Sequence, residues 1–128
     1  MFGVKYAQGR IDRILRTVGT DNNDIEIAAN DPNYTKRAEV TTLFPLTLFS
    51  TGAHMHLRGS AYTATAVFPD GTEHLMADVP RYDFNWQVNY ELAKPIEMPK
   101  GTTYRIDAKW DNSENNPYNP DPDKTVRW

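Results

Sequence analysis

The sequence predicts an all-β fold, a single antiparallel β-sandwich, on three observations. No segment of 11 or more residues places apolar side chains at the i, i+3, i+4 and i+7 positions of an amphipathic helix. Short runs of alternating apolar and polar residues recur instead, separated by clusters of Gly, Pro, Asn and Asp. A length of 128 residues fits one domain, and three tryptophans, seven tyrosines and five phenylalanines supply the volume of a core without disulfides. We therefore expect residues 1–128 to form one folded unit.

The alternating runs predict nine short strands. In chain order they cover residues 2–6, 12–18, 24–28, 37–43, 46–57, 61–68, 73–78, 87–92 and 102–111. The sequence Pro69-Asp70-Gly71 combines a fixed φ with a residue that tolerates positive φ, and this combination is typical of a hairpin turn. We expect the strands on either side of this turn to pair antiparallel.

Two of these strands predict the core, because side chains two positions apart share one face of a strand. Apolar side chains occupy alternate positions in residues 61–68 and again in residues 102–111. The predicted core residues are Tyr62, Ala64, Ala66 and Phe68 from the first strand, and Tyr104, Ile106, Ala108 and Trp110 from the second.

Charge and composition exclude several partners. With 14 basic and 17 acidic residues the net charge is -3, and no run of Lys or Arg forms the positive stripe that nucleic acid requires. We therefore expect no nucleic-acid partner. No apolar stretch approaches the roughly 18 residues of a membrane span, so no direct membrane insertion is expected, and residues 1–10 lack the layout of a signal peptide. The absence of cysteine removes disulfides, thiolate metal ligands and a cysteine nucleophile.

A Pro-, Asn- and Asp-rich segment, residues 112–123, predicts a surface loop, because its three prolines cannot donate hydrogen bonds to a sheet. Oxygen donors are frequent in and beside this segment, and Ca²⁺ prefers such atoms. Their spacing does not match an EF-hand, and Asn and Asp side chains also cap backbone amides in ordinary loops. The oxygen donors are Asp111, Asn112, Glu114, Asn116, Asn119, Asp121 and Asp123.

Two further features each have two interpretations. Residues 81–87 alternate polar and aromatic side chains, which suits either a stacking platform for a ligand or a strand that packs its aromatic face in the core, and we expect the second. The aromatic residues are Tyr82, Phe84 and Trp86. Arg58 either anchors a carboxylate such as Asp83 or Asp78, or is a solvated surface side chain.

The pair of His54 and His56 is the strongest candidate site. On a strand, residues i and i+2 share a face with Cβ atoms about 6 to 7 Å apart, so both imidazoles can reach one metal ion. Neutral imidazole suits copper and zinc, and two histidines leave a position for water or another side chain. His74 and Met76 are the candidates for this position, since a thioether favours reduced copper. The alternative is a polar strand face with hydrogen-bonded histidines.

Several segments taken together resemble one protein family. They read HMHLRG, then FPDGTEHLMADVPRYDFNWQ, then MPKGTTYRIDAKWDNSENNPYNPDPDKTVRW, with KYAQG and DPNY nearer the N-terminus. The combination resembles the copper type II, ascorbate-dependent monooxygenases, the superfamily of peptidylglycine α-hydroxylating monooxygenase and dopamine β-monooxygenase. The resemblance covers nearly the whole chain and is densest over residues 53–128.

The resemblance implies a jelly-roll β-sandwich, the second of two domains that each hold one copper ion. It implies hydroxylation of an unactivated C–H bond with oxygen and electrons from ascorbate. His54 and His56 match the two histidines that bind the oxygen-activating copper of the second domain. The resemblance also implies an extracytoplasmic protein, periplasmic or secreted, whose partner is a missing first domain or a larger assembly.

The sequence departs from the family pattern in two places. The family's methionine ligand follows the segment that here ends at Trp128, and Lys5 stands where the other copper site has a histidine. An ammonium group must lose its proton before it can bind a metal, so Lys5 is a poor substitute. We therefore expect a domain that binds one copper ion and is not catalytic as an isolated chain. The alternative is a non-catalytic accessory or structural subunit of a larger membrane or extracytoplasmic assembly, which keeps the fold without the metal.

Overall fold

The computed structural model describes residues 3–127, which form strands and loops. Eight strands occur among these residues, and the expected all-β class is confirmed. In chain order the strands are β1 Glu26–Ile27, β2 Tyr34–Thr41, β3 Leu46–Thr51, β4 Gly59–Val67, β5 Glu73–Val79, β6 Tyr90–Met98, β7 Thr103–Trp110 and β8 Val126–Arg127. They form three antiparallel sheets, all of them open. The described residues contain no helix of the length and apolarity needed to cross a membrane.

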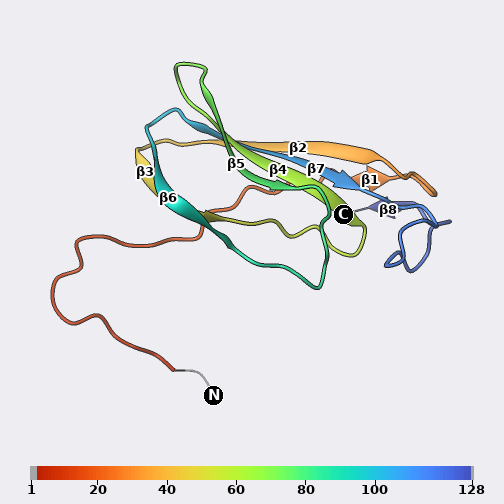
Figure 1. Ribbon diagram of the computed structural model, residues 1–128, viewed down its shortest axis with the longest axis horizontal. Helices are drawn as coiled ribbons and strands as arrows, with labels where there is room; N and C mark the ends of the chain where they lie inside the picture. The colour runs from red at the N-terminus through yellow and green to blue at the C-terminus, as the bar shows by residue number, and fades with distance from the viewer. Residues whose placement is uncertain (1–2, 128) are drawn as a thin grey trace.

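The largest sheet has the strand order β2-β7-β4-β5 (Figure 1). The expected hairpin joins β4 to β5, and these two strands pair antiparallel. At its turn Gly71 adopts a φ of 84°, and the backbone N–H of Thr72 donates to Asp70 Oδ1 at 2.9 Å. The local turn signal thus determined the pairing of the two strands that flank it.

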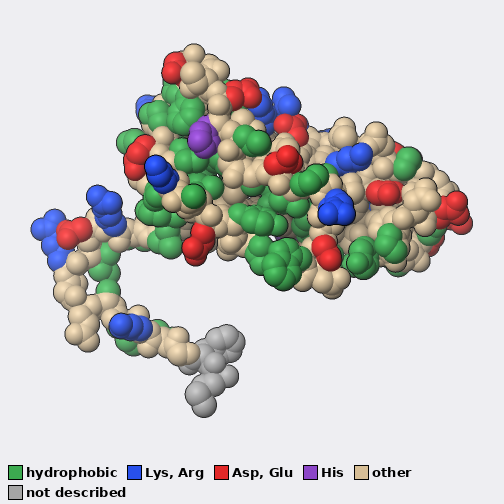
Figure 2. Space-filling view, in the orientation of Figure 1, with side chains coloured by type: hydrophobic (Ala, Val, Ile, Leu, Met, Phe, Trp, Pro, Cys, Tyr) green, Lys and Arg blue, Asp and Glu red, His purple; other side chains and the backbone are tan. Residues whose placement is uncertain are grey.

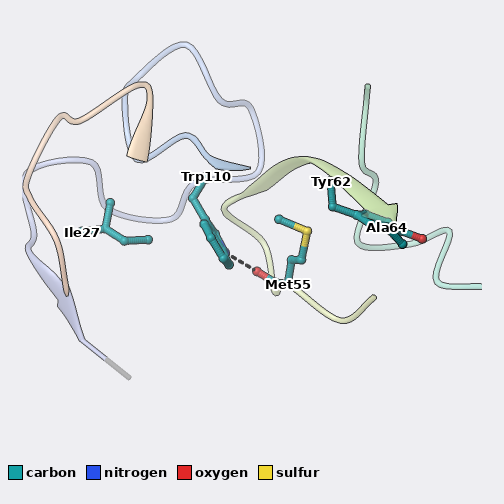
Figure 3. Close-up of a cluster of buried hydrophobic side chains, with 5 residues drawn as sticks. All are labelled: Ile27, Met55, Tyr62, Ala64 and Trp110. Atoms are coloured by element: carbon teal, nitrogen blue, oxygen red, sulfur yellow. Dashed lines mark hydrogen bonds between the residues drawn. The ribbon is translucent and has the colours of Figure 1, made fainter. Parts of the chain in front are cut away.

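One face of this sheet forms the core, as the alternation in β4 and β7 predicts. Tyr62 and Ala64 of β4 are buried, and Trp110 of β7 is 9% exposed. Ile27 from β1 and Met55 from the loop before β4 pack in the same cluster (Figure 3). Burying a large apolar side chain of this kind contributes roughly 1.5 to 3 kcal/mol. Of the other predicted core residues, Ala66 is buried, and Phe68, Tyr104, Ile106 and Ala108 are half-buried.

The strand pairings are nested. β4 pairs with β5, β3 with β6, β2 with β7 and β1 with β8, so each pair encloses the previous one in the sequence. β4 also pairs with β7, which joins two of the pairs into the four-stranded sheet. The other two pairs are separate two-stranded sheets, which lie toward opposite ends of the large sheet (Figure 1).

The strands expected at residues 2–6 and 12–18 are wrong, because residues 3–24 form no strand; Phe2 lies outside the described residues. The apolar side chains of this segment are exposed, with 81% of Leu15 and 82% of Tyr6 accessible. Figure 2 shows the segment standing away from the body, with basic and hydrophobic side chains along it. Alternation alone does not make a strand, because the backbone needs a partner edge for its hydrogen bonds.

Other boundaries also differ from expectation. The strands expected at residues 37–43, 61–68, 73–78 and 102–111 are present as β2, β4, β5 and β7, with shifted ends, and residues 24–28 contribute only the short β1. β6 begins and ends later than the expected residues 87–92. The register of β3 and β6 shifts between Leu48 and Ser50, and Pro95, which has no N–H to donate, falls in this irregular part. β3 ends at Thr51 instead of continuing to residue 57.

Candidate functional site

A cleft of about 410 Å³ lies against the inner face of β2 and β7. Ile106 and Trp110 of β7 line its floor, and Ile27 and Val126, from β1 and β8, line one side. Residues 52–56, the chain segment that continues β3, line another side. Residues 20–25, which precede β1, also line it, so the cleft is enclosed by the large sheet, the β1–β8 sheet and the segment that carries the histidine pair.

His54 and His56 both line this cleft, but they lie in a loop and not on a strand as expected. His56 adopts a φ of 58°, a left-handed backbone conformation that is uncommon for residues other than glycine. The two rings nevertheless lie side by side, with centroids 4.6 Å apart and planes at 77° to each other. The two imidazoles are thus brought together by a turn of the backbone. The sequence had predicted the same proximity from the two-residue period of a strand.

Hydrogen bonds to the backbone of Met55 hold this loop in place. Trp110 Nε1 donates to the carbonyl oxygen of Met55 at 3.0 Å, and the N–H of Met55 donates to Tyr82 Oη at 3.2 Å. Gly59 closes the turn, since its N–H donates to the carbonyl oxygen of His56 at 3.1 Å. A Cβ atom on Gly59 would approach Met55 Cβ to 2.5 Å, so glycine permits the close packing of the loop on itself.

The Asn-rich loop fixes the other end of the histidine segment. Arg58 Nε donates to Asn112 Oδ1 at 2.6 Å, and Arg58 Nη2 donates to the carbonyl oxygen of Asp121 at 3.3 Å. Asn112 is fully buried and also donates to the carbonyl oxygens of Ala28 and Lys124. Residues 112–123 therefore form a surface loop with a buried anchor. Neither interpretation of Arg58 holds: its side chain is bonded to the Asn-rich loop instead of solvated, and both of its acceptors are neutral amide oxygens in place of Asp83 or Asp78.

Gln87 is a site residue that sequence reasoning missed. Its Oε1 contacts His54 Nδ1, and its Nε2 donates to the carbonyl oxygen of Phe84 at 2.7 Å. The second bond turns the amide oxygen of Gln87 toward the imidazole, so His54 Nδ1 donates to it, and His54 Nε2 is the ring nitrogen left for another partner. Such outer contacts commonly set the orientation and tautomer of histidine ligands. No local pattern marks Gln87, because its partner is far away in the sequence.

The expected strand at residues 81–87 is a loop, and its aromatic side chains have different environments. Tyr82 and Phe84 are half-buried beside the histidine loop, and the Phe84 ring lies 6.2 Å from that of His54. Trp86 is 67% exposed, so its predicted place in the core is wrong. Side-chain bonds of its polar residues stabilise the turn in this loop: Asp83 Oδ1 accepts a hydrogen bond from the N–H of Asn85 at 2.8 Å.

The environment of His56 favours its neutral form. Partial burial lowers the pKa of His56, and the neighbouring His54 lowers it further. A neutral imidazole has a nitrogen lone pair, which a metal ion requires. His56 therefore offers such a nitrogen beside the ring of His54.

The structure does not bring His74 to this pair. His74 of β5 pairs with Ala66, whereas the histidine loop enters β4 at Gly59, and the seven-residue rise along the strand is about 23 Å. Met76 packs against the hydrophobic core. Within residues 3–127 no group of three or more His, Cys, Asp or Glu side chains is arranged to hold a metal ion, and this includes the acidic residues of the Asn-rich loop.

Comparison with protein-family models and with curated proteins found no match to this chain. The function of the site is therefore argued from its own geometry. Its main elements are two adjacent imidazoles, a glutamine that orients one of them, and an apolar cleft beside them.

Proposed function

We propose that this chain is a copper-binding domain in which His54 and His56 hold one copper ion at the edge of the cleft. The observation that carries the proposal is the pair of neighbouring rings, 4.6 Å apart between centroids, on a loop that hydrogen bonds hold from both sides. Imidazole nitrogen suits copper, and two histidines leave open positions for water or for a donor from another polypeptide.

The topology supports a jelly-roll sandwich as the fold of this domain. In a jelly roll a long antiparallel hairpin wraps around so that its strand pairs divide between two sheets. The nested pairs seen here are compatible with this division: two form the β2-β7-β4-β5 sheet, and the other two form separate two-stranded sheets. A pairing of β8 with β3 would join these two small sheets into one with the order β1-β8-β3-β6.

The surroundings of the rings support metal binding over a purely polar surface. The bond to Gln87 leaves Nε2 of His54 as the nitrogen available to a metal ion, and partial burial favours the neutral form of His56 by lowering its pKa. Copper bound here would supply redox chemistry, as the resemblance to ascorbate-dependent monooxygenases suggests. The residues of this chain hold and orient the ion, and we propose that a second domain or a larger extracytoplasmic assembly supplies electrons and substrate.

Copper titration tests this proposal. We expect one Cu²⁺ per chain by isothermal titration calorimetry, with a nitrogen-ligand pattern in electron paramagnetic resonance. His54→Ala and His56→Ala each lower the affinity more than about tenfold, and Gln87→Leu lowers it about tenfold through the orientation of His54. His74→Ala, a matched substitution outside the cleft, leaves the affinity unchanged. Equal binding by the two loop variants and the parent protein would leave the accessory, metal-free function as the better proposal.

A further inference from the structure

The nested pairing leaves a gap in the second layer. β8 pairs with β1 along one of its edges, and β3 pairs with β6 along one of its edges. Among the described residues, neither strand has a partner on its other edge. An unpaired edge presents N–H and C=O groups that can pair with an additional strand. Val126 of β8, the segment that continues β3 and residues 20–25 all line the cleft, and a strand added there would lie beside these open edges.

The walls of the cleft match the inward face of a strand. Its floor and sides are mostly apolar, with Ile27, Val126, Ala53, Ile106 and Trp110 around the space. Every second side chain of an added strand would point into this apolar space, and the others would point outward. We therefore expect a strand bound in the cleft to have apolar side chains at alternate positions.

The charges around the cleft favour an acidic occupant. The cleft lining holds three cations, Lys36, Arg37 and Arg58, and one acidic residue, Asp21. Arg37 pairs with Asp107, and Lys36 Nζ lies 3.1 Å from a carboxylate oxygen of Asp24, whose side chain is 98% exposed. Within residues 3–127, Arg58 is in no ion pair and donates only to neutral oxygens. Carboxylates on a bound peptide would meet these cations, whereas a basic peptide would be repelled.

We propose that the cleft binds an extended peptide segment with alternating apolar and acidic side chains, which pairs as a strand between β8 and the continuation of β3. This is recognition by β-strand addition, in which backbone hydrogen bonds give affinity and side-chain pockets give specificity. The proposal does not depend on copper. A strand in this position passes beside the histidine loop, so the occupant also determines which groups of a partner lie next to the two imidazoles.

Fluorescence anisotropy with two labelled peptides tests the proposal. One peptide alternates Val and Glu, and the other has Lys in place of every Glu. We expect the acidic peptide to bind at least about tenfold more tightly than the basic one. Ala53→Trp fills the cleft and weakens binding at least about tenfold, whereas Ala61→Trp, a matched change on the opposite face of β4, does not. Lys36→Gln reduces the preference for the acidic peptide.

The outcomes separate clearly. Far-UV circular dichroism establishes that each variant keeps its β structure. Equal affinity for the two peptides, or equal loss of binding in Ala53→Trp and Ala61→Trp, overturns the proposal. Because the peptides are titrated without metal and with both histidines intact, a failure here is distinct from a failure of copper binding.

Discussion

Replacing Trp110 by phenylalanine tests whether the core and the histidine loop are held together by one side chain. Trp110 is 9% exposed, its Nε1 donates to the carbonyl oxygen of Met55 at 3.0 Å, and its ring meets that of Tyr34 edge-on at 5.9 Å. Trp110→Phe leaves the Met55 carbonyl without this donor in a buried position, which costs about 1 to 3 kcal/mol. The smaller ring loses roughly 1 kcal/mol more in buried apolar area.

We therefore expect Trp110→Phe to lower the free energy of unfolding by about 2 to 4 kcal/mol. Trp86→Phe is the matched control, because Trp86 is 67% exposed and its replacement should change stability by no more than about 0.5 kcal/mol. Urea denaturation followed by far-UV circular dichroism measures both, since this signal does not depend on indole fluorescence. If the two variants lose the same stability, the reasoning about the Met55 bond is refuted.

Two further predictions concern the side of the core nearest the loop. Burial raises the pKa of Tyr62 to about 12, above the value of about 10 in an unfolded chain, so stability is complete below about pH 10 and falls as the pH rises toward 12. Tyr62 Oη is buried without a hydrogen-bond partner among the described residues, so Tyr62→Phe should keep the parent's stability at neutral pH and lose less stability at alkaline pH. Urea midpoints measured at both pH values test this. A variant that is less stable than the parent at neutral pH would show that the hydroxyl is stabilising. Gly59→Ala places a methyl group 2.5 Å from Met55 Cβ and 2.9 Å from the Tyr82 ring, and should cost about 1 to 3 kcal/mol. Gly19→Ala, with nothing within 4 Å of its added Cβ, should cost much less in the same assay, and a similar loss in both would contradict the packing argument.

Those parts of the fold that depend on local signals could be predicted from the sequence. The turn at residues 69–71 and the alternation in β4 and β7 are examples, because neighbouring residues alone determine a turn type or the buried face of a strand. β8 could not be predicted, since it has two residues and pairs with β1 from the other end of the chain. In residues 12–18 the apolar pattern is less regular than in β4, because Ile14 and Leu15 are adjacent, and this segment forms no strand.

The sequence singled out His54 and His56, but not the geometry that brings them together. The two rings lie side by side through a left-handed backbone turn at His56, next to Met55, whose backbone is bonded to Trp110 and Tyr82. Gln87 has no local signature, because its contact with His54 joins loops that are distant in the sequence. Long-range contacts of this kind depend on the complete topology, which residue spacing does not encode.

The nested strand pairs imply an order of folding. The hairpin of β4 and β5 closes a very short loop, whereas the bond from Arg127 Nη2 to Glu26 Oε1 joins residues 101 positions apart. The entropic cost of closing a loop rises with the number of residues it encloses. We therefore expect the β4–β5 hairpin to form first and the β1–β8 pair to form last. β1 and β8 are also the shortest pair, with two residues each, so we expect them to open at the lowest free energy in native-state hydrogen exchange. Because Ile27 of β1 and Val126 of β8 line the cleft, opening of this pair would widen the cleft while the other strand pairs stay formed.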